Sequence, residues 1–359
     1  MSTKRADGRL QKSVTIDGER IFVYGHNERE IRDKIDQLYN AKYRGITPDT
    51  LFRDYAAHWL DVTLPDKAIN TQIGYKRAVK HLIEELGDMP IADIKRSQLE
   101  KALNNHSDKP TSRNQMLLRA RAIFNLAIDD EICTYNPALN IKHLKTDHGS
   151  RDRLTPAEIN AVKSADLPPM ERLFVDILYH TGIRRGEALA ISRKSLGKGV
   201  LYIREQTVFT DSGVAVLTPL KTHNASRDIP IPQSLENEIR AYIKACDSIY
   251  LFEPMRSRHR FASAWYRIRL AIHRVDHPGY NPKRKTRYIV VGDIPCRLTP
   301  HFFRHNYASA LYDNHIDIKT AQKLLGHASI NTTLGIYTHL AKESQIDSYE
   351  AVREMSAAM

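Results

Sequence analysis

Apolar residues recur at helical spacing almost throughout residues 49–130, and this pattern constrains the fold of the chain more strongly than any other. Ser97 with Glu100 is typical of a capping box at the start of one helix, and Gly87 to Pro90 indicates a stop and a turn after another. We therefore predict a compact domain of four or five helices. The predicted helices span residues 51–60, 71–86, 98–104 and 113–130.

A small ββα unit is predicted ahead of this domain. Residues 9–16 and 20–24 alternate partly between polar and apolar, and the Asp-Gly pair between them is a strong hairpin signal. Asn27 with Glu30 then predicts the start of a helix. At about forty-five residues the unit is marginal as an independent domain. Its basic residues fit a solvated surface about as well as contact with DNA. They are Lys4, Arg5, Arg9, Lys12 and Arg20.

The rest of the chain has mixed α/β signals. Thr155 and Glu158, with proline directly after the threonine, mark a clear helix start, and a more apolar helix is predicted at 170–180. An Asp-Ser-Gly turn signal divides two strand-like segments, so a hairpin is expected there. The predicted strands are 200–209, 214–217 and 227–231.

A chain of 359 residues is too long for one ordinary core, so two or three domains are expected. A polar, basic connector without periodicity follows Asn136-Pro137 and favours a boundary there. The predicted fold class is multidomain and mainly α with small β-sheets. We place the domains at 1–46, 47–145 and 150–359.

The charge of the chain indicates a polyanionic partner, because the net charge is +12 and the isoelectric point is near 9.5. Residues 256–297 hold eleven Lys or Arg and only two acidic residues. Clustered like charges repel one another unless a polyanion neutralises them, so phosphate binding explains this stretch better than a free surface does. Nucleic acid is the leading candidate.

Several function classes are disfavoured. The chain has no run of about eighteen apolar residues and no signal segment, so we expect no membrane partner and a cytoplasmic location. The three cysteines, Cys133, Cys246 and Cys296, are odd in number and far apart, which fits neither a disulfide framework nor a zinc site. No His-x-x-x-His or Cys-x-x-Cys pair has supporting ligands. We expect no metal and no cofactor.

One set of residues has the composition needed for phosphodiester chemistry. Tyr337 has an ordinary pKa near 10 and needs cationic neighbours to act as a nucleophile. Two arginine forks on one phosphate would neutralise the charge of its non-bridging oxygens, and a lysine in a nearby turn could protonate the departing oxygen. The candidate residues are Arg184, Lys221, His301, Arg304, His327 and Tyr337.

Each member of this set also has an ordinary structural explanation. His301 could be a hydrogen-bonded helix residue, and Gly326-His327 could be a helix cap. Arg184 and Glu187 could form an intrahelical ion pair worth about 0.3 to 0.5 kcal/mol, and Tyr337 could be a packing residue. Taken singly, each structural explanation is favoured. Taken together, in this order and in a basic protein, the residues favour function.

Residues 155–340 resemble the tyrosine recombinases, also called phage-type integrases. The motifs that carry the resemblance are Thr-Gly-Ile-Arg-Arg-Gly-Glu at 181–187, Lys221-Thr222, His301-Phe-Phe-Arg304-His305, Leu-Gly-His327 and Ile-Tyr337-Thr-His. The resemblance implies that Tyr337 forms a 3′-phosphotyrosyl bond, that Arg184 and Arg304 clamp the phosphate, and that Lys221 protonates the 5′-oxygen. It also implies that His301 and His327 assist charge stabilisation and proton transfer, and that Glu187 is a structural partner for this site.

The resemblance extends to the other two domains. It implies a helical core-binding domain at 49–140, a mixed α/β catalytic domain, a clamp around double-stranded DNA, and more weakly an arm-binding ββα unit. It implies a homotetramer on DNA, possible bending and excisionase partners, and a nucleoid-associated location in a bacterial host cell. Candidate DNA-binding residues are Lys76, Arg77, Lys80, Arg113, Asn114, Arg119, Arg256, Arg258, Lys283, Arg284 and Lys285.

Three alternatives stay open at the level of sequence. The same chemistry would serve a type IB-like topoisomerase or a chromosome-dimer-resolving recombinase, whereas an N-terminal basic unit favours integration and excision of a phage or other mobile element. A DNA-binding protein with decayed catalytic motifs is the third alternative, and the complete residue set argues against it. The sequence does not identify the recognition sites, the element or the direction of recombination.

Overall fold

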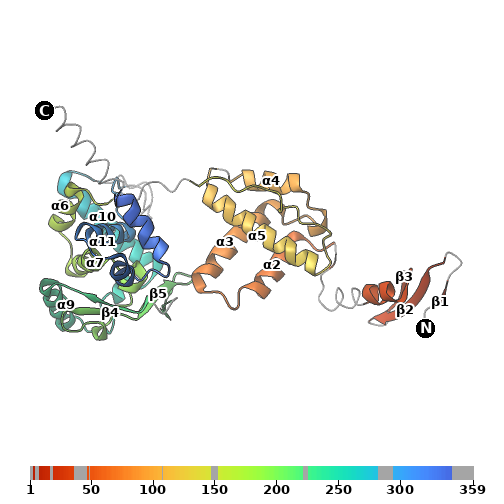
Figure 1. The fold of residues 1–359 in the computed structure, drawn as a ribbon, viewed down its shortest axis with the longest axis horizontal. Coiled ribbons are helices and arrows are strands. Elements are labelled where there is room, and N and C mark those ends of the chain that lie inside the picture. The colour runs from red at the N-terminus through yellow and green to blue at the C-terminus, as the bar shows by residue number, and fades with distance from the viewer. Residues whose placement is uncertain are drawn as a thin grey trace, which may run out of the picture. The chain divides into compact units, whose positions relative to one another are not determined.

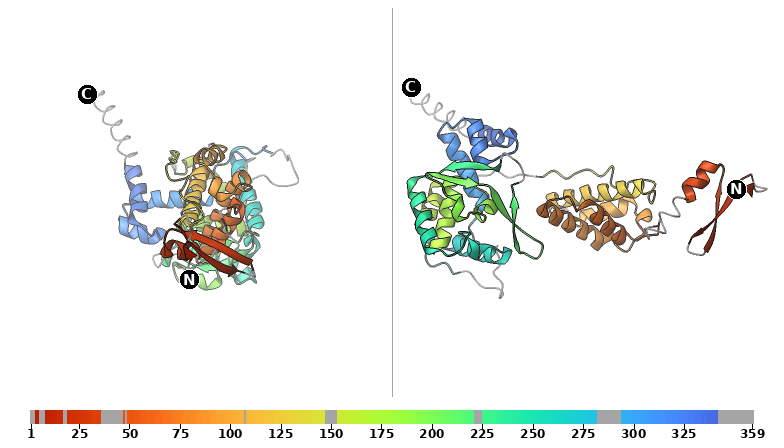
Figure 2. Two further views of the ribbon diagram at one scale, coloured as in Figure 1. Left: turned by 90° about the vertical axis from the view of Figure 1, so that its right-hand side faces the viewer. Right: turned by 90° about the horizontal axis from the view of Figure 1, so that it is seen from below.

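The computed structural model describes residues 3–4, 8–16, 19–35, 47, 49–106, 108–146, 153–220, 225–281 and 294–341. The chain divides into two compact units, Met1–His148 and Gly149–Met359. Figures 1 and 2 show their elements. No helix within the described residues is both long enough and apolar enough to cross a membrane.

The N-terminal unit begins with an antiparallel sheet in the order β1-β2-β3. Strand β2 pairs with β3 from Leu10 opposite Gly25 to Ile16 opposite Glu19. A helix at 28–35 follows, and Asn27 caps it by accepting a 2.8 Å hydrogen bond from the Glu30 amide. The predicted ββα unit is thus confirmed, with one short extra strand, although its Asp-Gly turn lies outside the described residues. The strands are β1 Thr3–Lys4, β2 Leu10–Ile16 and β3 Glu19–Gly25.

The helical part of the first unit has the four predicted helices, three of which begin two or three residues earlier than predicted. Helix α4 begins two residues earlier than predicted, because the Gln98 side chain accepts a 2.8 Å bond from the Lys95 amide. Gln98 therefore caps the start of this helix through its side chain alone, and the capping box predicted from Ser97 and Glu100 was wrong. Phe52, Tyr55, Leu82, Leu99 and Phe124 are fully buried in a common core. The elements are α2 Phe52–Thr63, α3 Ile69–Leu86, the 3₁₀ turn η1 Ile91–Asp93, α4 Arg96–Asn104 and α5 Pro110–Asp129.

The second unit is mainly helical (Figure 1). Helix α6 starts with the predicted capping box, since the Thr155 hydroxyl accepts from the Glu158 amide and the Glu158 carboxylate accepts from the Thr155 amide. A helix at 330–341, where the described residues end, carries Tyr337. The others are α6 Pro156–Ser164, α7 Pro169–Thr181, α8 Arg185–Ala188, η2 Arg193–Ser195, α9 Gln233–Ala245, η4 Glu253–Met255, α10 Arg258–Asp276, α11 Pro300–Asp313 and α12 Ile318–Leu325.

Two small antiparallel sheets replace the single long strand predicted at 200–209. Strand β4 pairs with β7, whereas β5 pairs with β6 across the predicted hairpin turn. Arg204 lies between β4 and β5, at the point where the pairing partner changes from β7 to β6. Its guanidinium donates to the Ile203 and Arg227 carbonyls. The strands are β4 Val200–Ile203, β5 Glu205–Phe209, β6 Ala215–Pro219 and β7 Arg227–Pro230.

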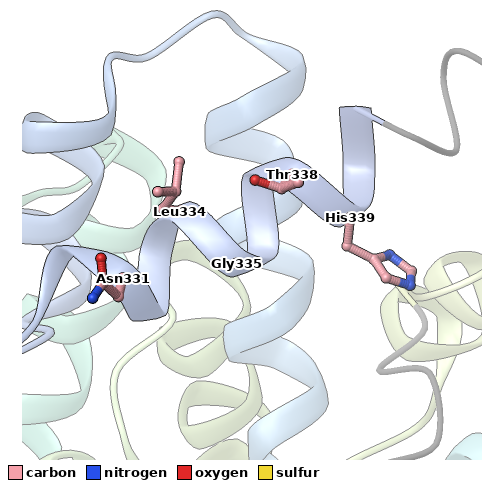
Figure 3. Close-up of a pocket in the computed structure, with 5 residues that line it drawn as sticks. All are labelled: Asn331, Leu334, Gly335, Thr338 and His339. Carbon is pink, nitrogen blue, oxygen red and sulfur yellow. The ribbon is translucent and has the colours of Figure 1, made fainter.

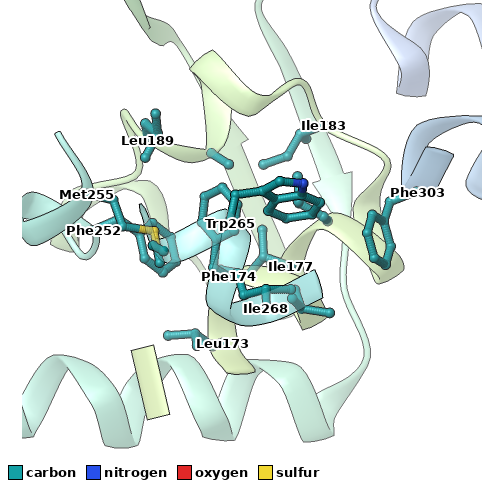
Figure 4. Packing of buried hydrophobic residues seen from close by; sticks show 14 of the residues in the cluster. Leu173, Phe174, Ile177, Ile183, Leu189, Phe252, Met255, Trp265, Ile268 and Phe303 are labelled. Atoms are coloured by element: carbon teal, nitrogen blue, oxygen red, sulfur yellow. The ribbon is translucent and has the colours of Figure 1, made fainter. Parts of the chain in front are cut away.

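An aromatic core fixes α11 in the second unit (Figure 4). Phe174 meets Phe252 edge to face with ring centroids 5.0 Å apart, and Trp265 meets Phe303 in the same way at 6.1 Å. Phe303 is fully buried, so the rotation of α11 about its axis is set by packing. The next residue, Arg304, is thereby placed on a defined side of the helix.

Candidate active site

Three arginines from three different elements converge on the C-terminal end of α12. The Leu324 carbonyl accepts from Arg227 Nε at 2.7 Å, the Leu325 carbonyl accepts from Arg304 Nη2, and the Gly326 carbonyl accepts from Arg184 Nη2 at 3.1 Å. The last carbonyls of a helix have no partner inside the helix and carry its partial negative charge. Three successive carbonyls therefore hold three guanidinium groups close together.

Gly326 makes this arrangement possible. It has φ +65°, the left-handed conformation that commonly ends a helix with glycine. A Cβ at this position would lie 2.9 Å from Arg227 Nη1. The glycine therefore serves both the backbone turn and the close approach of the arginine.

Glu187 joins two of the arginines. Its side chain is 1% exposed, and its two oxygens accept from Arg184 Nη1 and Arg227 Nη2, each at 2.8 Å. Burial alone would raise the pKa of Glu187, but Arg227 and Arg184 outweigh it and the pKa is lowered. Glu187 is therefore a carboxylate that fixes the arginines, and it has no proton to give at neutral pH.

The turn that carries Arg184 is also held by close backbone approach. A Cβ on Gly186 would lie 2.7 Å from the Thr207 carbonyl of β5, so the glycine of the Arg-Arg-Gly-Glu motif lets α8 pack directly on that strand. Arg304 comes from α11 and donates to the Gly182 carbonyl at 3.1 Å. Burial, with Arg184 and Arg227 nearby, lowers the pKa of Arg304, whose guanidinium still stays charged at neutral pH.

His327 directly follows this arginine cluster. Its ring is buried, and Nδ1 lies 2.9 Å from the hydroxyl of Thr333, which is 0% exposed. Burial and the neighbouring Arg304, Arg184, Arg227 and His305 lower the pKa of His327 to about 3. The ring is therefore neutral at physiological pH and carries one N–H proton.

Two consecutive segments of the chain match known protein families. The Phage integrase family matches residues 152–344, more than half of the chain, and the Phage integrase central domain matches residues 52–143. The chain belongs to the phage integrase family. It is a tyrosine recombinase, as the sequence resemblance predicted, and so a site-specific recombinase.

Individual members of the family are similar over most of the chain. The ICEBs1 integrase of Bacillus subtilis (strain 168) is 26% identical over 331 residues, which cover 89% of this chain and 86% of that protein. The tyrosine recombinase XerA of Thermococcus kodakarensis is 28% identical over 290 residues, covering 78% of this chain and 88% of that protein.

Solved integrases share the fold. The Tn1549 transposon integrase in complex with transposon right end DNA has a TM-score of 0.64 and 21% identity, covering 84% of this chain and 99% of that one. A lambda integrase dimer bound to a COC′ core site has a TM-score of 0.57 and 20% identity, covering 94% of both chains. The multidomain fold class predicted from the sequence is thus confirmed.

The structure places Tyr337 in a different setting from the one expected for a nucleophile. Its ring is 7% exposed and meets Tyr312 edge to face at 5.2 Å, and its hydroxyl donates to the Ile316 carbonyl at 3.2 Å. Burial and Asp317 raise the pKa of Tyr337, whereas cationic neighbours would lower it. In this conformation the phenol is a packing group on the segment between α11 and α12.

The remaining predicted catalytic residues have less defined surroundings. His301 is exposed in the first turn of α11, with its ring 5.5 Å from that of His305. Lys221 lies outside the described residues, which resume at Ala225 after ending at Leu220, just beyond β6. Within the described ranges, no three His, Cys, Asp or Glu side chains gather as metal ligands.

The candidate DNA-binding residues of the first unit fall into two groups. Lys76, Arg77 and Lys80 are exposed on α3. Arg113, in contrast, is buried and donates to the Lys142 carbonyl at 3.0 Å, and Asn114 exchanges two hydrogen bonds with the Leu144 backbone. These two residues tie the connector after the helical domain to α5, and their contact with DNA stays a prediction.

Three further candidates also have partners inside the protein. Arg119 lies 3.7 Å above the ring of Tyr75. Arg256 stacks 4.0 Å from the ring of Tyr250 and pairs with Glu253 at 2.9 Å. Arg258 donates to the Thr210 carbonyl at 2.8 Å, at the tip of the β5–β6 hairpin. Lys283, Arg284 and Lys285 lie outside the described residues.

Sequence reasoning missed two residues of this site, Arg227 and Thr333. Arg227 had a usable signal, because β7 alternates buried and exposed residues and places an arginine on the buried side with Ile229. A charged residue at a buried strand position requires a partner, here Glu187. Thr333 had no such signal, since a threonine next to Thr332 in a helix is unremarkable.

A shallow pocket lies on the outer side of the Tyr337 helix (Figure 3). Its residues come from the exposed side of residues 330–341, whereas Thr333 and Tyr337 are buried on the opposite side. The pocket is therefore separate from the arginine cluster. Its lining is Asn331, Leu334, Gly335, Thr338 and His339.

Proposed function

We propose that this chain is the integrase of a phage or other mobile element and that it cuts and rejoins DNA through a 3′-phosphotyrosyl bond to Tyr337. The observation that carries the proposal is the convergence of Arg184, Arg304 and His327 at the end of α12. Phosphoryl transfer depends on positioning the phosphate and neutralising its oxygens, and two guanidinium groups beside a neutral histidine can do both.

Arg184 and Arg304 differ in exposure and therefore contribute to phosphate binding in different ways. The Arg184 side chain is 37% exposed while it is held by Glu187 and Gly326, so it can reach a phosphate from the surface. Arg304 is buried and adds positive charge from the protein interior, where the low polarity strengthens its attraction for the phosphate. His327 donates a hydrogen bond to a non-bridging oxygen without adding a titrating charge.

The covalent step exchanges one phosphodiester for another. The Tyr337 oxygen attacks the phosphorus, the bond from phosphorus to the 5′-oxygen breaks, and Lys221 gives that oxygen its proton. The tyrosine proton passes to His301, while His327 stabilises the charge on the phosphate oxygens. Attack by the 5′-hydroxyl of another strand reverses the step. Because the bond energy is kept in the phosphotyrosine, rejoining requires no nucleotide cofactor.

Tyr337 has to leave its packing site before it can attack. The hydrogen bond to the Ile316 carbonyl is worth about 1 kcal/mol, and the contact with Tyr312 adds about as much. These are small energies beside those of specific DNA binding, which reach about 10 kcal/mol and more. DNA binding can therefore supply the energy that releases the tyrosine.

We propose double-stranded DNA as the partner, bound by three domains at 1–46, 47–145 and 150–359. The similar solved structures support this, since the Tn1549 and lambda integrases are in complex with DNA. The likeness to lambda integrase covers 94% of this chain for the longer solved chain and 78% for the fragment 75–356. That difference supports an N-terminal arm-binding unit here.

The assembly is proposed from the chemistry of strand exchange. Four strands must be cut, so four active sites are needed, and a homotetramer is expected on the DNA. The lambda integrase tetramer bound to a Holliday junction supports this expectation. DNA-bending and excisionase partners, and association with the nucleoid of a bacterial cell, belong to the same proposal. The ICEBs1 and Tn1549 integrases support a mobile element as the substrate.

The proposal is tested with nicked suicide duplexes made from the boundary sequences of the element that encodes the chain. The wild type is expected to become linked to DNA, and Tyr337→Phe is expected to bind the same duplex without a covalent adduct. Footprinting on the same boundaries checks for two kinds of binding site. Absence of any adduct would favour a DNA-binding protein, and relaxation of a single supercoiled plasmid without recombination would favour a topoisomerase.

A further inference from the structure

Thr333 is completely buried and lies next to one specific atom of the candidate active site. Its Oγ1 is 2.9 Å from Nδ1 of His327, within hydrogen-bond distance. The two residues come from different elements, because His327 follows α12 and Thr333 belongs to the helix at 330–341. This hydrogen bond therefore fixes the histidine ring against the helix that carries Tyr337.

The direction of the hydrogen bond follows from the chemistry of a neutral imidazole. Such a ring carries a proton on one nitrogen and a lone pair on the other, and the partner of one nitrogen sets the role of the other. A ring that faces an anionic phosphate needs an N–H group on that side. If Nδ1 accepts from the threonine hydroxyl, the proton is on Nε2.

We propose that Thr333 is a positioning residue for DNA cleavage, which donates to Nδ1 of His327 and so keeps Nε2 as the donor to the scissile phosphate. The inference rests on the proposed function and adds a residue to it. Burial, with Arg304, Arg184, Arg227 and His305 nearby, lowers the pKa of the ring and keeps it neutral. What is left to determine is which of its two nitrogens carries the proton. The threonine hydroxyl makes that choice.

Thr333 and Tyr337 are four residues apart and so lie on the same side of their helix. Thr333 contacts His327 while Tyr337 contacts Ile316. A movement of this helix that brings Tyr337 to the phosphate therefore also acts on the hydrogen bond between Thr333 and His327. The Thr333 hydrogen bond keeps the ring aligned in the conformation that first receives DNA.

The test compares three substitutions in the full-length chain. Thr333→Val keeps the shape and removes the hydroxyl, Thr333→Ser keeps the hydroxyl, and Thr332→Val makes the same change at the exposed neighbour. Single-turnover formation of the DNA adduct is measured on a suicide duplex, together with DNA affinity and melting temperature. Losing one hydrogen bond predicts roughly 10-fold slower cleavage for Thr333→Val at unchanged affinity. Thr333→Ser and Thr332→Val are expected to stay within about 3-fold of wild type.

A second measurement reads the proton position directly. Nitrogen NMR of ¹⁵N-histidine-labelled protein distinguishes protonated from unprotonated ring nitrogens, and comparison with His327→Gln assigns the signals of His327. The wild type and Thr333→Ser are expected to carry the proton on Nε2 alone, whereas Thr333→Val shows both forms.

Each outcome decides the inference. A proton on Nδ1 in the wild type, or wild-type cleavage by Thr333→Val, overturns it. Equal loss of cleavage, affinity and melting temperature in both Thr333 variants also overturns it, because that pattern indicates a merely structural residue. If the wild type forms no adduct at all, the proposed function fails, and the nitrogen signals still decide whether Thr333 selects the ring form.

Discussion

Glu187 and Arg227 form an ion pair with 2.8 Å between Oε2 and Nη2, and their side chains are 1% and 0% exposed. Arg227 also donates to the carbonyls of Leu324 and Ala225. The pair therefore connects α8, β7 and α12 at the point where Arg184 is held. A buried ion pair is costly to form and more costly to break, because the remaining charge loses both its partner and its water.

Arg227→Met is expected to destabilise the protein by about 3 kcal/mol, at the low end for a broken buried pair, because Arg184 still compensates Glu187. Urea unfolding measures the change. Arg153→Met is the control, since its pair with Asp313 is 41% and 48% exposed and should contribute below about 1 kcal/mol. Equal effects of the two substitutions would contradict a special role for Arg227.

Gly326→Ala is expected to lower stability by about 1 to 2 kcal/mol and to slow DNA cleavage. The cost arises from the left-handed conformation, and the new Cβ also pushes on Arg227, which shifts the carbonyls that hold Arg184 and Arg304. Gly335→Ala is the control. Gly335 lies inside the helix at 330–341 and its Cβ would meet nothing within 4 Å. That variant should gain about 0.5 to 1 kcal/mol.

His327 makes stability depend on pH in a defined direction. Its folded pKa of about 3 is below the ordinary 6.5, so the unfolded chain binds the extra proton first as the pH falls. The stabilisation that the neutral His327 ring gives the folded state is complete above about pH 6.5. It is lost as the pH falls to about 3, at up to about 1.4 kcal/mol per pH unit.

His327→Gln should therefore lose less stability than the wild type between about pH 7 and about pH 5, as measured by urea unfolding at each pH. His339→Gln is the control, because His339 is exposed on the Tyr337 helix (Figure 3). Parallel pH profiles for the wild type and His327→Gln would show that the ring is not held neutral by its surroundings.

The sequence predicted the elements well where local chemistry determined them. The capping box of Thr155 and the hairpin of β5 and β6 follow from residues close in the chain. One error arose where a second local cap competed with the predicted one, and another where a contact distant in the chain divided a strand. Gln98 closed a cap two residues before the predicted one, and the Arg204 side chain separated two strands that read as one.

The candidate site was predictable as a set of residue types but not as a geometry. The ordered motifs indicated Arg184, Arg304 and His327. Nothing in them shows that Arg184 and Arg304, together with Arg227, bind successive carbonyls at the end of α12. Arginines such as Arg113 have the same sequence appearance whether they contact a phosphate or a backbone carbonyl. Only the fold separates the two roles, because burial depends on residues far away in the chain.

The packing of Tyr337 predicts that weakening its resting site speeds cleavage. Tyr312→Leu removes the edge-to-face ring contact, worth about 0.5 to 1.5 kcal/mol, and leaves the hydrogen bond from Tyr337 to the Ile316 carbonyl in place. If release of the phenol limits the first cleavage, adduct formation on saturating suicide DNA should rise about 2- to 10-fold.

Tyr312→Phe serves as the control because it retains the ring and should leave the cleavage rate unchanged. A slower reaction in Tyr312→Leu at unchanged DNA affinity would mean that Tyr312 also supports the attacking conformation. A rate equal to that of the wild type would mean that release of Tyr337 precedes the slow step. The faster rate is expected because the contact with Tyr312 helps to hold the phenol in its buried site, where its pKa is raised and its hydroxyl is bound to the Ile316 carbonyl.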